Sequence, residues 1–250
     1  MEKIGRLEAV DSLRGLALVS MMAYHGAWDL VFLFGVKLRW FPDVPGLLWQ
    51  QSICWTFIFL AGFSWQLGRS PAKRGLVILA GGAVISLITA LVGQPVRFGI
   101  LTLLGSCTLL WIPLDRVLRR IPPAWGAGCF FPAFLILQSL DQPYDWRAAA
   151  WIPEQLRPDM ALAYLGFPQP GFSSADYFPL LPWVLLFGTG YFVFSWMKNR
   201  GILRKYLGKG RIPGISLLGR HSLLVYLIHQ PVLYGLGFLG LWLAGRIGSF

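Results

Sequence analysis

Long stretches without any charged side chain alternate along the chain with short segments in which charges gather. A helix needs roughly 17 to 25 mostly apolar residues to cross a bilayer. Six stretches of about this length contain no Asp, Glu, Lys or Arg: Val44–Gly68, Gly75–Val96, Phe98–Leu114, Ile121–Leu140, Tyr177–Met197 and His221–Gly245. A seventh stretch, Gly15–Val36, would qualify but for Asp29 within it. The pattern therefore predicts about seven membrane-spanning segments.

These segments are expected to be helices. A bilayer interior cannot hydrogen-bond an unpaired backbone, and no stretch alternates polar and apolar residues as a barrel strand does. We predict an all-α, polytopic membrane helix bundle that forms one transmembrane domain over residues 1–250. The expected spans are approximately 12–36, 45–68, 75–95, 98–116, 122–140, 178–198 and 216–245, with an extracytoplasmic loop at 141–176 and a basic cytoplasmic loop at 198–215.

Composition agrees with this picture and gives it an orientation. Of the 250 residues, 56% are hydrophobic and only 13% are charged, against about a quarter charged in soluble domains. The net charge is +11, and 16 of the 22 basic residues fall on the side of the predicted bundle that carries the N-terminus. Because cytoplasmic loops are enriched in Lys and Arg, the N-terminus is predicted to be cytoplasmic. The charge thus reflects topology and contact with anionic membrane lipids, and we expect no nucleic-acid partner.

The three cysteines indicate no further chemistry. Cys54, Cys107 and Cys129 all lie in predicted spans, and their odd number and irregular spacing favour neither a disulfide framework nor a metal site. We therefore expect no bound metal.

Polar side chains inside the spans are the first functional candidates, because they are costly there unless they are paired. His25 and Asp29 are four residues apart on one face of the first predicted helix, and His25 lies roughly 18 Å along that span. A neighbouring carboxylate would orient the imidazole as a general base requires. The alternative interpretation is a structural hydrogen bond between helices.

A second group of candidates lies near the predicted outer ends of the last two helices. His229 is at nearly the same depth as His25, with Tyr226 one turn before it and Pro231 two residues after it. Proline removes a backbone hydrogen bond, so the helix is expected to kink there. Asp176 and Tyr177 precede the predicted helix 178–198, where the aspartate can cap the helix or make the outer mouth acidic. For His229, kink packing and a lining role remain equally open.

Basic residues on the predicted cytoplasmic side form a third group of candidates. Arg6 and Arg14 flank Asp11 at the beginning of the first helix, and Arg69, Lys73 and Arg74 follow the second. Arginines beside a helix N-terminus bind phosphate well. An entirely structural role, in which these arginines pair with Asp11, is equally open.

Five segments, in order, resemble the heparan-α-glucosaminide N-acetyltransferase catalytic-domain family within the transmembrane acyltransferases. The first is Arg6–Ala17, Arg-Leu-Glu-Ala-Val-Asp-Ser-Leu-Arg-Gly-Leu-Ala, followed by His25 and Asp29. The other four are Phe57–Ser64, Arg97–Leu101, Asp176–Trp183 and Gly219–Pro231. Each segment alone is a weak match, but five in sequence are fairly specific. The chain is similar to a short, bacterial-type member.

This resemblance implies a membrane acyltransferase that moves acetyl from cytosolic acetyl-CoA to a sugar amine or hydroxyl of an extracytoplasmic glycan or lipid-linked sugar. His25 is then the implied base or acyl acceptor and Asp29 its orienting partner. The implied acceptor side comprises Asp176, Tyr177, Tyr226 and His229, and the implied CoA-binding residues are Arg6, Arg14, Arg69, Lys73 and Arg74. The implied location is a bacterial inner membrane and cell envelope, as a monomer or a homodimer.

Two other classes of function compete with the enzyme. A proton-coupled transporter or lipid-handling protein would use His25, Asp29 and His229 as a proton relay. A non-catalytic membrane subunit would use the same side chains only to join helices. Transport driven by a pH gradient without consumption of acetyl-CoA would favour the transporter. Substitutions of these three residues that leave activity unchanged would favour the non-catalytic subunit.

Overall fold

The protein is an all-helical membrane chain. The computed structural model describes residues 6–140, 160–169 and 171–243, and no strand occurs in these ranges. Six helices are long and apolar enough to cross a membrane, and Pro123–Gln138 is a shorter apolar helix. The prediction of a polytopic helix bundle is thereby confirmed. Most of the predicted loop 141–176 lies outside the described residues.

The chain divides into two compact units, each of which is described by itself. One unit comprises residues 1–57 and 203–250, and the other comprises residues 58–202. Helix α2 (Val44–Phe63) passes from the first unit into the second. Single-domain organisation remains a prediction.

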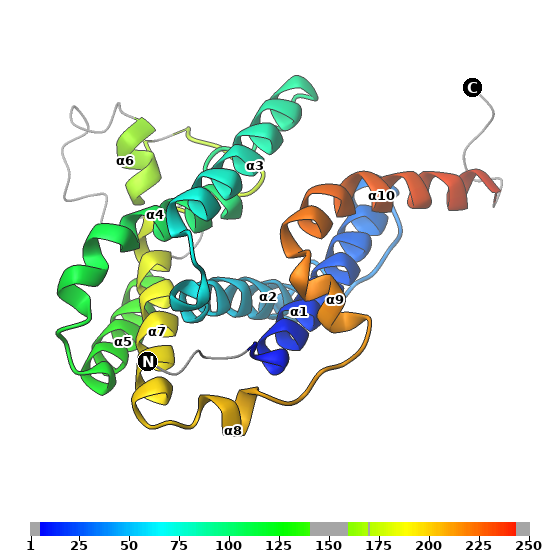
Figure 1. The fold of residues 1–250 in the computed structure, drawn as a ribbon. Helices are drawn as coiled ribbons and strands as arrows, with labels where there is room; N and C mark the ends of the chain where they lie inside the picture. Colours follow the sequence, from blue (N-terminus) through cyan, green and yellow to red (C-terminus); the bar gives the residue numbers. More distant parts are fainter. Residues whose placement is uncertain (1–5, 141–159, 170, 244–250) are drawn as a thin grey trace. The chain divides into compact units, whose positions relative to one another are not determined.

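The first unit is built around α1 (Glu8–Trp28), whose neighbours in the unit include α9 (Ile215–Arg220) and α10 (Ser222–Leu243) (Figure 1). Helix α1 continues into a π-helical turn, η1 (Asp29–Leu33). The short helix α8 (Leu203–Leu207) precedes α9. The predicted span 216–245 is therefore divided, because the chain turns at His221 between α9 and α10.

Small residues allow close packing of α1 against α9. A Cβ atom added to Gly15 would collide with the backbone of Ile215, and one added to Gly219 would collide with the backbone of Asp11. Helices inside a bilayer associate largely through such close backbone approach, because lipid provides no hydrophobic drive between them. The two glycines therefore fix the position of Arg220 near the beginning of α1 within this unit.

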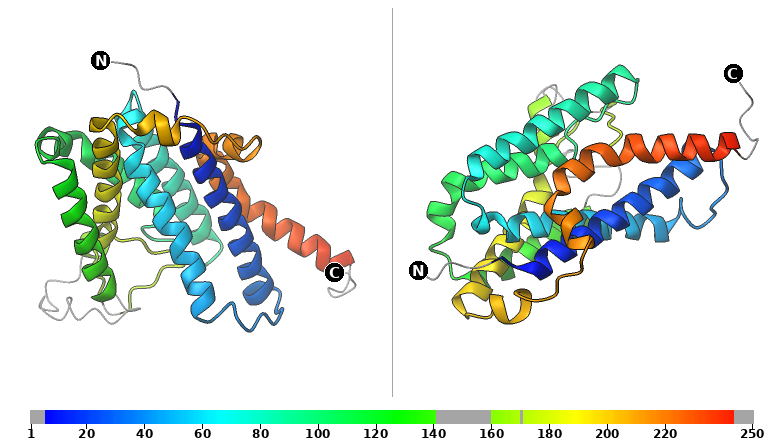
Figure 2. Two further views of the ribbon diagram at one scale, coloured as in Figure 1. Left: turned by 90° about the horizontal axis from the view of Figure 1, so that it is seen from below. Right: turned by 45° about the vertical axis from the view of Figure 1, so that its right-hand side comes forward.

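The second unit pairs its helices in two sets. Helix α3 (Pro71–Leu91) packs on α4 (Ile100–Leu118), and α5 (Pro123–Leu140) packs on α7 (Leu180–Asn199) (Figure 2). The short elements η2 (Trp65–Leu67) and α6 (Met160–Leu165) complete it. Phe192 of α7 covers Gly126 of α5, and Phe130 of α5 covers Gly188 of α7. Aromatic rings over glycines thus join these two helices from both sides.

Candidate active site

The two predicted histidines of the spans meet in the first unit. The ring centroids of His25 on α1 and His229 on α10 are 4.9 Å apart, with the rings inclined at 60°. The Tyr226 ring lies 5.3 Å from that of His229, and Tyr24 contacts His25 edge-on at 5.7 Å. His229 is 7% exposed. The sequence placed these side chains at one depth, and the fold brings them into contact.

Asp29 lies one turn beyond His25, where α1 passes into the π-helical turn. Such turns are rare and are frequent at functional sites. The Asp29 carboxylate is 2% exposed, and its Oδ1 accepts a hydrogen bond of 2.7 Å from Nε2 of Gln230. No hydrogen bond joins it to His25 among the described residues. The orienting partner of Asp29 is thus an amide of α10 and not the imidazole four residues earlier.

Several acceptor atoms of this group are buried without a hydrogen-bond partner among the described residues. They are Oδ2 of Asp29, Nε2 of His229 and Oε1 of Gln230. Buried polar atoms in folded proteins are nearly always paired, and exceptions often mark sites that a ligand completes. This group is therefore suited to binding a molecule that presents hydrogen-bond donors.

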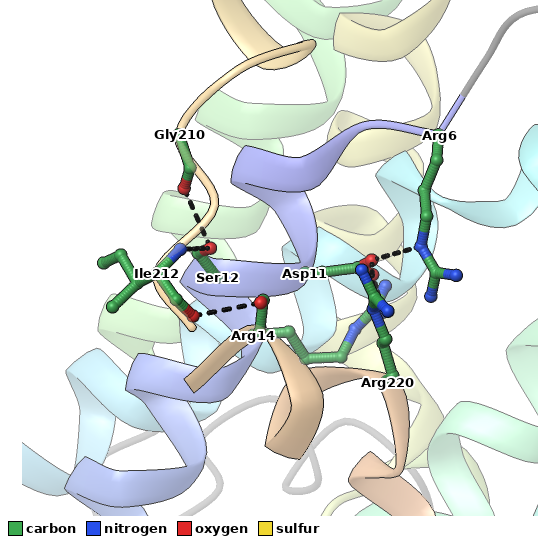
Figure 3. Close-up of polar contacts among 8 residues, drawn as sticks. Arg6, Asp11, Ser12, Arg14, Gly210, Ile212 and Arg220 are labelled. Atoms are coloured by element: carbon green, nitrogen blue, oxygen red, sulfur yellow. Dashed lines mark hydrogen bonds and ion pairs between the residues drawn. The ribbon is translucent and has the colours of Figure 1, made fainter. Parts of the chain in front are cut away.

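A cationic cluster forms at the beginning of α1 in the same unit. The Asp11 carboxylate pairs with Nε of Arg6 at 2.7 Å, with Nη1 of Arg14 at 3.7 Å and with Nε of Arg220 at 3.5 Å (Figure 3). Among the described residues, three guanidiniums thus face the single carboxylate of Asp11. Helix N-termini and clustered arginines both favour phosphate.

Ser12 ties the chain before α9 to this cluster. Its hydroxyl donates to the carbonyl of Gly210 at 2.9 Å and accepts from the amide of Ile212 at 3.1 Å (Figure 3). Ser216 in turn donates to the carbonyl of Ile212 at 3.0 Å. Because α9 follows directly, these bonds help to hold Arg220 beside Asp11.

The other predicted basic residues belong to the second unit. Nη2 of Arg74 donates to the carbonyl of Trp65 at 3.1 Å, a contact that closes the turn between η2 and α3. Arg69 and Lys73 lie in and just after this turn. Of the five predicted CoA-binding residues, only Arg6 and Arg14 are therefore brought together around Asp11 within one unit.

Asp176 and Tyr177 also belong to the second unit. Oδ2 of Asp176 accepts from the amide of Ile100, so the carboxylate caps the beginning of α4 and not the α7 helix that it precedes. Burial raises the pKa of Asp176 to about 6, an effect that the Ile100 amide partly offsets. The Tyr177 hydroxyl donates to the carbonyl of Ala163. Of the two alternatives for Asp176, the capping of its own helix is therefore not observed.

Two members of these clusters were absent from the predicted site. Gln230 lies between His229 and Pro231, and a polar side chain inside a span was the feature that could have revealed it. Arg220 has no such sequence feature, since its role depends on α9 packing against α1.

The fold and the clusters define a membrane protein with a histidine pair inside its spans and an arginine cluster at the beginning of α1, and comparison places it in a family. The family model described as heparan-alpha-glucosaminide N-acetyltransferase, catalytic, matches residues 6–231. The chain therefore belongs to this family of membrane acetyltransferases. Neither a curated protein nor a solved structure matches the chain significantly.

Proposed function

We propose that this protein transfers acetyl from cytosolic acetyl-CoA to a sugar amine or hydroxyl of an extracytoplasmic glycan or glycolipid, in a bacterial inner membrane. The observation that carries the proposal is the family match, which extends from Arg6 to Pro231 and includes the histidine pair and the arginine cluster. Acetyltransferases of this kind use acetyl-CoA as donor.

The arginine cluster is the proposed site for the phosphates of the donor. The three gathered guanidiniums and the N-terminus of α1 both favour phosphate oxygens. About 21 Å of helix separate Asp11 from His25 on α1. A donor held by its phosphates at the cluster would therefore reach His25 only with its pantetheine arm extended. Arg69, Lys73 and Arg74 remain proposed as further contacts of the nucleotide.

The histidine pair is the proposed reaction centre. An imidazole can take the proton of the attacking amine or hydroxyl, and the burial of His229 would keep water from a thioester held there. Asp29 is four residues beyond His25, and its charge favours a proton held nearby. The sequence favoured His25 as the base, with Tyr226 and His229 on the acceptor side. Asp176 and Tyr177 remain proposed acceptor residues.

Reconstituted vesicles test this proposal. With acetyl-CoA on one side and glucosamine on the other, the wild type is expected to form N-acetylglucosamine, and His25→Ala is expected to lose at least a hundredfold in rate. His221→Ala is the matched control, because this exposed histidine lies between α9 and α10, outside the proposed centre. Full activity of His25→Ala would contradict the role of His25, and no transfer by the wild type would contradict the function.

A further inference from the structure

The backbone of α10 fixes the tautomer of His229. Nδ1 of this ring lies 2.6 Å from the carbonyl oxygen of Tyr226. A carbonyl only accepts hydrogen bonds, so Nδ1 must carry the hydrogen. In the neutral ring, Nε2 then holds the free lone pair. His229 therefore presents a buried basic nitrogen, and this nitrogen has no partner among the described residues.

Asp29 and Gln230 present acceptors of the same kind. Their mutual hydrogen bond uses Oδ1 of Asp29 and the amide nitrogen of Gln230, and it leaves Oδ2 and Oε1 buried without partners in the described part of the chain. Gln230 follows His229 directly, so the bond ties this pair to the histidine backbone. All three unpartnered atoms of the group are acceptors.

This surplus of acceptors identifies the kind of molecule that would complete the site. A buried acceptor without a donor costs roughly 1 to 3 kcal/mol, so three in one group are a substantial liability. A hydroxyl or amine group cancels that cost by donating hydrogen. The carbonyl of a thioester cannot, because it has no hydrogen to donate. The group therefore fits the acceptor of the acetyl group better than it fits the thioester end of the donor.

We infer that Nε2 of His229, rather than a nitrogen of His25, takes the proton from the acetyl acceptor, while Oδ2 of Asp29 and Oε1 of Gln230 bind its other donor hydrogens. This inference rests on the proposed function. The acceptor nitrogen or oxygen bonds to the acetyl carbon as the carbon–sulfur bond of acetyl-CoA breaks. The acceptor's proton passes to Nε2 and then to the departing sulfur, which leaves as the CoA thiol.

His25 then acts as a positioning residue. The centroid of its ring lies 4.9 Å from that of His229, and the ring of Tyr24 contacts the His25 ring edge-on. No hydrogen bond fixes the tautomer of His25 among the described residues, which contrasts with the Nδ1 contact of His229. A hydrogen bond thus fixes the tautomer of His229 and none fixes that of His25 among the described residues, so the two variants should respond differently to added imidazole.

Rescue by free imidazole distinguishes the two histidines. The full chain in lipid nanodiscs is assayed with acetyl-CoA and glucosamine as His229→Ala and as His25→Ala, each with and without imidazole. Imidazole is expected to raise the His229→Ala rate at least tenfold and to leave His25→Ala unchanged. Rescue of His25→Ala alone, or of neither variant while both unfold thermally like the wild type, would overturn the assignment.

The role of Gln230 is tested by separating the two substrates. Gln230→Leu is expected to raise the KM for glucosamine at least tenfold while the KM for acetyl-CoA stays within twofold. Gln50→Leu, a substitution of the same kind on α2, is expected to change neither. An unchanged glucosamine KM, or equal rises for both substrates, would refute the binding role. An inactive wild type would instead refute the proposed function, so the two failures are distinguishable.

Discussion

Helix α1 and the π-helical turn η1 that continues it each carry one buried aspartate, and the two have opposite surroundings. Asp11 is 9% exposed and is surrounded by three arginines. Asp29 is 2% exposed, contacts one neutral amide and keeps a buried oxygen without a partner. A buried carboxylate is stable only when it is well paired. Asp11 is thus a structural anchor. Asp29 instead keeps one carboxylate oxygen that a bound ligand could contact.

Removing the anchor is expected to have the largest effect on stability. In Asp11→Ala, three partly exposed guanidiniums lose their common buried carboxylate, and we expect a cost of about 3 kcal/mol, the lower end of the range for buried ion pairs. Thermal unfolding in detergent should show a large decrease in Tm. Glu8→Ala, in the same first turn of α1, is the control and should leave the Tm nearly unchanged. Equal effects of the two substitutions would contradict the anchoring role.

The packing that supports the anchor gives the next largest effect. Gly219→Ala places a methyl group against the backbone of Asp11 and Gly15, and overpacking of this kind costs about 1 to 3 kcal/mol. Gly235→Ala on α10 meets no atom within 4 Å and should instead stabilise slightly, because alanine is the better helix former. Comparison of the two Tm values measures the packing effect. A Gly219→Ala variant as stable as Gly235→Ala would contradict it.

A third aspartate, Asp176 of the second unit, is expected to show a smaller effect that depends on pH. Burial raises its pKa to about 6, whereas the unfolded chain should titrate near 3.8. The folded state therefore binds more protons between pH 4 and 6, and stability falls as pH rises across that window.

Asp176→Asn tests this dependence directly. An asparagine oxygen can still accept from the amide of Ile100, but it does not titrate. The Tm of the variant minus the Tm of the wild type should increase from pH 4 to 6 and stay constant above pH 6. A constant difference from pH 4 to 7 would show that the pKa of Asp176 is not raised.

The fold could be predicted well from the sequence, because the insertion of a helix into a bilayer depends on the local composition of the chain. Five of the six spanning helices follow charge-free stretches, and the sixth, Glu8–Leu33, follows the stretch that contains Asp29. The remaining charge-free stretch forms the shorter helix Pro123–Gln138, and the predicted span 216–245 divides at His221. Just before that division Gly219 packs closely against Asp11, a contact that hydropathy does not encode. The prediction of orientation depends on loop charges and stays a prediction.

The site was less accessible to sequence reasoning, because its key contacts join distant segments. The depth of His25 and His229 suggested that they lie at one level, and their contact agrees with this. Helical spacing suggested a pair of His25 with Asp29, but the carboxylate bonds to Gln230, 201 positions away. Asp176 likewise caps α4, 76 positions away. Sequence spacing shows which residues are neighbours within one helix, but it does not show which residues of two different helices form a hydrogen bond.

The smallest expected effect on stability distinguishes Asp29 most sharply from Asp11. In Asp29→Asn the new amide can donate to Oε1 of Gln230 while its oxygen keeps the existing bond, so both unpartnered atoms of the pair become satisfied. Stability should stay equal or rise by up to about 1 kcal/mol. Acetyl transfer should nevertheless fall at least tenfold, because the acceptor loses its partner on Asp29. Thermal unfolding and transfer to glucosamine measure the two effects on one preparation. A decrease in Tm like that of Asp11→Ala, with transfer intact, would show that both aspartates are structural.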